Sequence, residues 1–349
     1  MDIKYGFRRG EPVAQPNTAN RGSDVWREDF LVIDGLQITN WDRAALEELR
    51  TGGVSGVNAT CAVWEGPTEA LRNIGDWYQL ARKHSDLVTL ASTVGDIVAA
   101  KAEGRIAVLL GFQNTSPFAD DYTLVEVFHR LGVRIAQLTY NIQNVVGGAC
   151  YDPEDSGLTR FGRNIVAEMN RVGMLVDLSH VGNRTCRDAI DASATPVAIT
   201  HANPTWFFDT ARNKPADVIK ALVDRGGILG CCLYPNVLGG ARVTREQFCE
   251  MVVRLVDEIG IEHVAIGSDC ARNWDDDYVG WLRNGRWQPP SGDGDKPTWP
   301  SWPSWFTGPE DFPTLTEGLF DAGLNDDDVA RVLGGNWLNL FETVFEGSA

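Results

Sequence analysis

The chain has 349 residues, of which 43% are hydrophobic and 23% charged, and 48 acidic residues against 31 lysines and arginines give it a formal net charge of −17. A chain of this length and composition can bury a large apolar core. Its excess of negative charge is repelled by nucleic acid phosphates and by anionic membrane surfaces, so we expect a small-molecule partner and neither nucleic acid nor membrane.

Residues 1–29 form an N-terminal extension without an apolar stretch of signal-peptide length, and the chain has no run of about 18 apolar residues that would span a membrane. We therefore expect a cytoplasmic protein. The seven cysteines include no Cys-x-x-Cys pair, which argues against a disulfide framework and against a cysteine-bound zinc ion. Cys150 and Cys270 are candidate catalytic thiols, although a buried apolar role is favoured for both.

From residue 30 onward, short apolar runs alternate with amphipathic stretches, a pattern typical of β-strands followed by helices. The helical stretches, such as residues 68–85, 162–173 and 246–260, repeat apolar residues at three- and four-residue spacing. Residues 87–92 form an extra apolar run that is either a short strand or the start of a helix. Eight main strands are predicted, at residues 30–38, 54–63, 105–112, 134–140, 174–180, 196–202, 227–234 and 263–269.

Eight strands that are each followed by a helix are what a closed (β/α)₈ barrel, the TIM barrel, requires. The alternative is an open, doubly wound α/β sheet, but the glycine-rich phosphate loop that usually follows its first strand is missing. We therefore expect a single barrel domain over residues 1–349.

A tryptophan-rich segment at residues 270–312 interrupts the alternation and is expected to be a long loop. Because it follows the eighth strand, it leaves from the face where barrel active sites lie. A substrate lid and a packing or oligomer-contact loop both fit this position. Residues 313–349 are expected to form closing helices. Six of the twelve tryptophans lie in the loop: Trp274, Trp281, Trp287, Trp299, Trp302 and Trp305.

The position of each histidine in the predicted barrel separates structural from functional candidates. His84 and His129 fall in helical segments, and His263 begins the eighth strand at the opposite end of the barrel. His180 and His201, in contrast, close the fifth and sixth strands, where side chains point to the catalytic face. Neighbouring strand ends would hold these two imidazoles side by side, an arrangement that suits one metal ion.

Asp269 closes the eighth strand within the same ring of strand ends. A carboxylate there can transfer a proton or bind a substrate amine, so Asp269 is the best candidate for an acid/base residue.

Four stretches of the chain resemble, in order, the membrane dipeptidase (renal dipeptidase-like, peptidase M19) family of the amidohydrolase superfamily. They are GLTRFGRNIVAEMNRVGMLVDLSHVG, PVAITHANPTWFFDTARNKPADVI, HVAIGSD and LGGNWLNLF. The resemblance implies a barrel with two zinc ions, in which a bridging hydroxide attacks the amide bond of a dipeptide. It implies a hydrolase active in proteolysis, and it allows a homodimer, because family members often form one.

Several positions match residues with a role in that family. The resemblance implies that His180 and His201 bind the second zinc ion and that Arg212 holds the substrate carboxylate. Asp269 matches the family's strand-eight aspartate. Tyr234 resembles a tyrosine that contacts the substrate after the seventh strand.

Other positions depart from the family pattern. Leu36 and Ile38 stand where a histidine and an aspartate of the family bind the first zinc ion. Gln113 replaces a glutamate that bridges both ions, and a neutral amide cannot bridge two cations comparably. Tyr140 replaces the histidine that is thought to polarise the substrate carbonyl.

These departures predict that the centre holds zero or one zinc ion. Two imidazoles and an amide form a weak site, because catalytic zinc normally has three protein ligands. Asp269 could complete a mononuclear site with His180 and His201. Alternatively no metal binds, and one histidine acts with Asp269 as an acid/base pair.

Our leading hypothesis is a dipeptidase-like amidohydrolase that acts on a small amide carrying a carboxylate, with weak activity on common dipeptides. Asp269 would move protons, and Tyr140 and Gln113 would contact the substrate. One alternative is a non-hydrolytic acid/base enzyme, a tautomerase or a lyase, on the same barrel. Another is a catalytically silent binding protein, but a scaffold has no physical need for a polar ring in its mouth.

Overall fold

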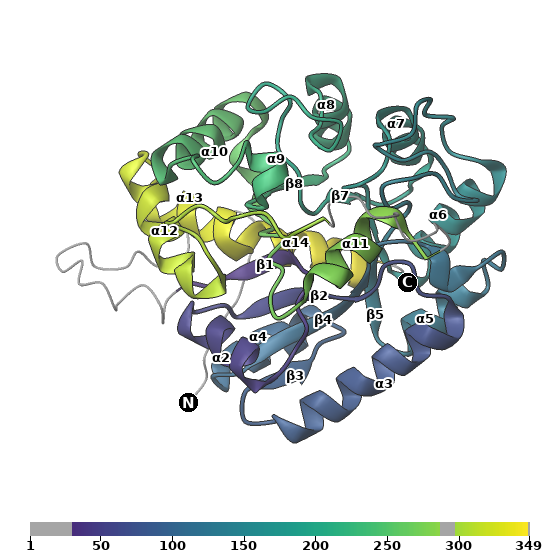
Figure 1. Cartoon of the computed structure of the whole chain (residues 1–349), viewed down its shortest axis with the longest axis horizontal. Coiled ribbons are helices and arrows are strands. Elements are labelled where there is room, and N and C mark those ends of the chain that lie inside the picture. The colour runs from purple at the N-terminus through teal and green to yellow at the C-terminus, as the bar shows by residue number, and fades with distance from the viewer. Residues whose placement is uncertain (1–29, 287–296, 348–349) are drawn as a thin grey trace.

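Eight parallel strands close into a barrel in the computed structural model, which describes residues 30–286 and 297–347 (Figure 1). Each strand of the ring pairs in parallel with the next strand of the ring along the chain. The ring closes between its first and last strands, where Ile38 N donates a hydrogen bond to Cys270 O at 2.9 Å. The (β/α)₈ barrel predicted from the sequence is confirmed. Its strands are β1 (Ile33–Gln37), β2 (Gly56–Ala62), β4 (Ile106–Phe112), β5 (Val133–Gln137), β6 (Leu175–Asp177), β7 (Ala198–Ile199), β8 (Ile228–Cys231) and β9 (Val264–Ile266).

The extra apolar run at residues 87–92 contains a strand, β3 (Val88–Leu90), which pairs with β4 outside the closed ring. The ring strands are shorter than the apolar runs that predicted them. His180, His201 and Asp269 therefore lie two or three residues beyond the ends of β6, β7 and β9, rather than on the last strand residue.

Helices follow the strands and cover the outside of the ring. Local signals set their ends: α10 begins with a capping box, in which Thr244 and Gln247 bond each other's backbone amides, and it ends at Gly260 with φ of 92°. The helices are α2 (Arg43–Thr51), α3 (Pro67–Lys83), α4 (Val94–Ala102), α5 (Leu124–Arg130), α6 (Arg160–Val172), α7 (Asn183–Ala192), α8 (Ala216–Asp224), α9 (Pro235–Leu238), α10 (Arg245–Ile259), α11 (Asp276–Asn284), α12 (Phe312–Asp321), α13 (Asp326–Ala330) and α14 (Asn336–Phe341).

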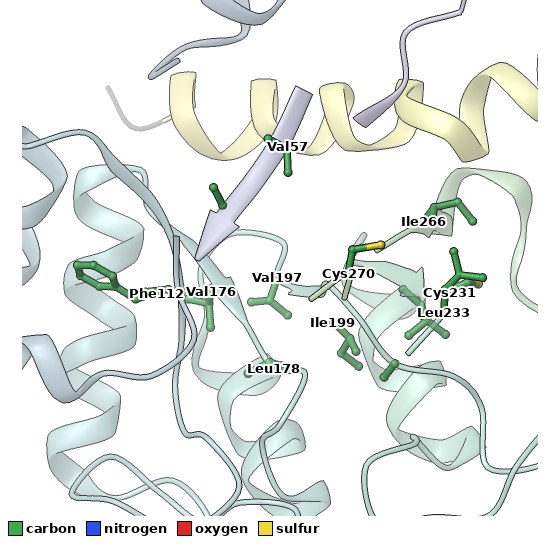
Figure 2. Close-up of a cluster of buried hydrophobic side chains, with 14 of the residues drawn as sticks. Val57, Phe112, Val176, Leu178, Val197, Ile199, Cys231, Leu233, Ile266 and Cys270 are labelled. Atoms are coloured by element: carbon green, nitrogen blue, oxygen red, sulfur yellow. The ribbon is translucent and has the colours of Figure 1, made fainter. Parts of the chain in front are cut away.

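Alternate strand residues face opposite sides of the barrel wall. Outward residues such as Val176 and Ile199 pack in the large cluster between strands and helices (Figure 2). Inward residues at the bottom, such as Leu175, pack with Trp337 of α14, which closes that end. Along β2, β4, β5, β6 and β7 the apolar filling stops below the mouth. The next inward positions are Thr60, Gln113, Gln137, Asp177 and Thr200, so the sequence pattern that builds the core also makes the upper interior polar.

The sequence suggested that the tryptophan-rich segment is a long loop, but part of it forms a helix. Asp275 accepts a hydrogen bond from Tyr278 N and starts α11, and the Trp274 and Tyr278 rings stack at 3.6 Å. Residues 287–296, with Trp287, and the extension at 1–29 lie outside the described residues. After α12, a continuous helical stretch runs over residues 326–346. Within the described ranges, no helix combines the length and apolar character needed to cross a bilayer.

Candidate active site at the barrel mouth

Two imidazoles meet at the mouth of the barrel. His180 follows β6 and His201 follows β7, and their Nε2 atoms lie 3.0 Å apart. Both side chains are buried. Burial lowers the pKa of each imidazole well below its usual value, and the positive charge of Arg212 lowers it further. Both histidines are therefore neutral near pH 7.

The Nδ1 atoms of both imidazoles are held by neighbouring side chains. His180 Nδ1 lies 2.7 Å from Asn141 Oδ1, and His201 Nδ1 lies 2.8 Å from Thr200 Oγ1. Because the Thr200 hydroxyl donates to Asp177 Oδ2 at 2.8 Å, its oxygen is left to accept from His201. Thr200 thus favours the proton on His201 Nδ1, the oxygen of Asn141 favours the same tautomer in His180, and in that tautomer the two Nε2 lone pairs face each other. This arrangement attracts a proton or a metal ion into the gap.

Arg212 lies against the same two histidines. Its guanidinium donates to Ser179 O at 2.6 Å and to His201 O at 2.8 Å, and the residue is only 3% exposed. Within residues 30–286 and 297–347, no carboxylate forms an ion pair with it. A buried cation without a counter-ion is costly, so this position favours binding of an anionic group.

Asp269 combines an unusual backbone with a perturbed carboxyl group. Its φ of 56° lies in the left-handed region, which a residue other than glycine adopts at a cost and which is enriched at functional sites. The pKa of Asp269 is raised to about 7, mainly by burial. The positive charge of Arg212 lowers this pKa, whereas the negative charges of Asp34 and Asp177 raise it. The side chain is partly exposed. Such a carboxyl group can both accept and release a proton near neutral pH.

Tyr140 borders the histidine pair, and Tyr234 follows β8. The Tyr140 ring stacks on His180 with centroids 4.2 Å apart, and Tyr234 meets Trp302 edge to face at 5.9 Å. Burial raises the pKa of both hydroxyls, and the negative charge of Asp269 raises it further. Both hydroxyls are therefore protonated at neutral pH and can donate hydrogen bonds.

Gln113 lies deeper, on the side of β4 that faces β2. Its Nε2 donates to Thr60 Oγ1 at 2.9 Å, and its backbone carbonyl accepts from Gln137 Nε2 at 2.6 Å. Its Oε1 is buried and has no partner among the described residues. The structure therefore brings His180, His201 and Tyr140 into contact, whereas Gln113 is anchored to β2.

The positions that the family resemblance assigns to the first zinc ion are apolar and filled. Leu36 is 2% exposed and Ile38 is 5% exposed. Ile38 belongs to a cluster that joins three strand ends to α11, which we name the apolar half of the mouth. Its buried members are Ile38, Val63, Trp64, Tyr140 and Leu282.

The donor set fits one metal ion better than two. His180 and His201 direct two bare nitrogens toward one point, but Leu36 and Ile38 offer no ligand atom. Across the described ranges, no group of three or more histidine, cysteine, aspartate or glutamate side chains is placed to hold a metal. Asp269 is therefore not gathered with the two histidines as a third ligand.

The sequence reasoning missed the residues that hold the site together. Asn141, Thr200 and Asp177 orient the imidazoles, and the buried Lys214 donates to Val181 O, directly after His180, at 2.6 Å. The signal for Asp177 was present, since it occupies an inward position of the same strand that leads to His180. All seven cysteines are free, and Cys270 is buried.

Three comparisons relate the chain to known proteins. The sequence model of the membrane dipeptidase family (peptidase family M19) matches residues 29–274. Dipeptidase verJ of Clonostachys rogersoniana is 28% identical over 335 residues, which cover 92% of this chain and 80% of that protein. The crystal structure of an amidohydrolase from Pseudomonas aeruginosa is 37% identical, with a TM-score of 0.87 over 92% of this chain and 98% of that one.

A third protein shares the fold at lower identity. The probable dipeptidase PvdM from Pseudomonas aeruginosa is 17% identical, with a TM-score of 0.77 over 93% of this chain and 98% of that chain. The family match spans most of the barrel, including the strand ends that carry His180, His201 and Asp269. The chain therefore belongs to the membrane dipeptidase family and is a dipeptidase-like hydrolase.

Proposed function

We propose that this hydrolase cleaves the amide bond of a small, dipeptide-like compound that carries a carboxylate, using a centre with at most one zinc ion. The observation that carries the proposal is the pair of imidazole Nε2 atoms, 3.0 Å apart, beside a buried guanidinium that has no acidic partner within residues 30–286 and 297–347. The first can activate an amide carbonyl or a water molecule, and the second can hold the substrate by its carboxylate.

His180 and His201 would hold the metal through their Nε2 atoms. A zinc ion bound there would polarise the scissile carbonyl and lower the pKa of a water molecule. Asp177, acting through Thr200, and Asn141 keep both rings in the tautomer that leaves Nε2 free. Leu36 and Ile38 supply no ligand for a second ion, which supports the limit of one.

The remaining residues bind the substrate and move its protons. Arg212 binds the carboxylate, and Asp269 takes a proton from the attacking water and passes it to the leaving nitrogen. Tyr140 donates a hydrogen bond to the carbonyl oxygen, and Tyr234 lines the pocket. The free Oε1 of Gln113 is available to an N–H group of the substrate.

A second candidate is acid/base chemistry without hydrolysis, such as tautomerisation or C–N bond elimination. It is favoured by the raised pKa of Asp269, about 7, beside two neutral imidazoles. These groups can move protons at neutral pH whether or not a metal binds.

Metal content and turnover, measured on the same preparation, test the proposal. We expect at most one zinc per chain by mass spectrometry of protein purified without chelator, and slow, zinc-dependent release of amino acids from a panel of dipeptides and N-acyl amino acids. Two zinc ions per chain would overturn the one-metal centre. A panel left intact both with and without added zinc would favour the second candidate.

A further inference from the structure

Helix α11 is fixed above the barrel mouth by contacts with the strand ends. Leu282 packs on Ile38 and Tyr140, and the backbone carbonyl of Leu282 accepts a hydrogen bond from Trp64 Nε1 at 3.2 Å. At the start of the segment, Trp274 Nε1 donates to Ile38 O at 3.0 Å. The residue after Leu282 is therefore held at a defined place beside the opening.

Arg283 is that residue, and it is exposed. Its guanidinium lies close enough to Tyr234, which follows β8, to lower the pKa of that hydroxyl against the effect of burial. It also lies close enough to Tyr151, in the connection between β5 and α6, to lower the pKa of that hydroxyl, as Arg212 does. Arg283 and Arg212 thus flank the same opening, one above it and one in its wall.

Neither arginine has an acidic partner within residues 30–286 and 297–347, although the chain carries 48 acidic residues. Arg286, three residues after Arg283, illustrates the contrast. It pairs with Glu69 at 2.9 Å and donates to Trp64 O. The barrel mouth is therefore lined by two guanidinium groups that remain available to an anionic ligand.

We propose that Arg283 determines specificity by binding a second acidic group of the substrate, so that the enzyme prefers compounds with two carboxylates. The inference rests on the proposed function, in which Arg212 binds the first carboxylate. A guanidinium can bind a carboxylate through two parallel hydrogen bonds, which gives both charge selection and orientation. The rigid attachment of α11 keeps the second guanidinium at a fixed place relative to the first.

Binding measurements with compounds that lack an amide bond test the preference without turnover. Straight-chain dicarboxylates from succinate to suberate are titrated calorimetrically, each beside the methyl ketone of equal size in which one carboxylate is replaced. We expect the best dicarboxylate to bind wild-type protein at least about tenfold more tightly than its methyl ketone. Arg283→Met should abolish this preference and leave the affinity for the methyl ketone unchanged.

Arg286→Met is the matched control, because it removes an arginine from the same segment that already has an acidic partner, and it should keep the preference. Arg212→Met should weaken binding of both compounds. Equal affinities in the wild type, no measurable binding of any of these compounds, or a preference that survives Arg283→Met would each overturn the inference. Hydrolysis assays remain independent, since a charge preference without amide cleavage would contradict only the proposed function.

Discussion

The two halves of the barrel mouth have the same origin, a ring of parallel strand ends, but they are stabilised in opposite ways. Around His180 and His201, the polar atoms of Asn141, Thr200 and Asp177 are connected by hydrogen bonds. In the apolar half, around Ile38, the side chains are held by packing against α11. One half is organised to present lone pairs, whereas the other is organised to exclude water.

This difference shows how apolar side chains that supply no ligand can still preserve the shape of the barrel mouth. An unpaired carboxylate in the place of Ile38 would be costly to bury, whereas an isoleucine in contact with Trp64 and Leu282 contributes to the core. We infer that the histidine half supports catalysis and that the apolar half supports stability, except for Tyr140, which belongs to the apolar cluster but stacks on His180 and is proposed to contact the substrate. Substitutions in each half can test this division.

The largest effect on activity is expected for His201→Ala. It removes one of the two Nε2 atoms and leaves the other without its counterpart, so kcat/KM should fall by about 10²–10⁴. Zinc content, measured by mass spectrometry, should fall in parallel. His129→Ala, on helix α5, is the control and should retain both. Unchanged turnover in His201→Ala with an intact fold would contradict the division.

Asp269→Asn should have the next largest effect and lower kcat/KM by a factor of about 10²–10⁴. Because burial raises the pKa of Asp269 to about 7, wild-type kcat/KM should increase as the pH rises through about 7, where the carboxyl group loses its proton. The asparagine variant should lack this limb of the pH profile. If the asparagine variant kept the same rise of kcat/KM with pH, another group would be responsible for the titration.

The same carboxyl group should affect the pH dependence of stability. The folded protein keeps the Asp269 proton up to about pH 7, whereas the unfolded chain loses it near its ordinary value of 3.8. The contribution of this group to the free energy of unfolding is therefore full below about pH 4 and is lost as the pH rises to about 7. Urea unfolding of Asp269→Asn should show a flatter pH dependence over this interval.

Much of the barrel could be predicted from the sequence, because its signals are local. The alternation of apolar runs and amphipathic stretches gave all eight ring strands, and the strand ends singled out His180 and His201. Helix α11 was missed because tryptophan, proline and glycine dominate the composition of its surroundings, although Asp275 is a good N-cap.

The supporting network could not be predicted, because it depends on how the strands align. Thr200 bonds to Asp177 only in the register that pairs β6 with β7. Asn141, in the connection between β5 and α6, contacts His180, in the connection that follows β6. Asp269 likewise adopts a left-handed backbone and donates its N–H to Leu36 O on another strand, a contact that its local sequence does not reveal.

Thr200→Val should have an intermediate effect. The substitution keeps the shape of the side chain but removes the oxygen that accepts from His201 Nδ1, so the ring loses its fixed tautomer. We expect kcat/KM to fall about 10- to 100-fold, mainly through kcat, with weaker zinc binding. Thr200→Ser keeps the hydroxyl and should restore most of the activity. A serine variant as impaired as the valine variant would point to packing instead.

Ile38→Ala should change activity least, because the Ile38 side chain has no atom that could bind a metal ion, donate a hydrogen bond or move a proton. It should nevertheless lower the free energy of unfolding by about 2–5 kcal/mol, since it opens a cavity between the β1 end and α11. Ile38→Val provides the graded control, with an expected cost of about 0.5–1.5 kcal/mol. Urea unfolding and kcat/KM are measured on the same samples. If Ile38→Ala stayed fully folded at the assay temperature yet lost activity as Thr200→Val does, the apolar half would have to act in catalysis, and the division between the two halves would fail.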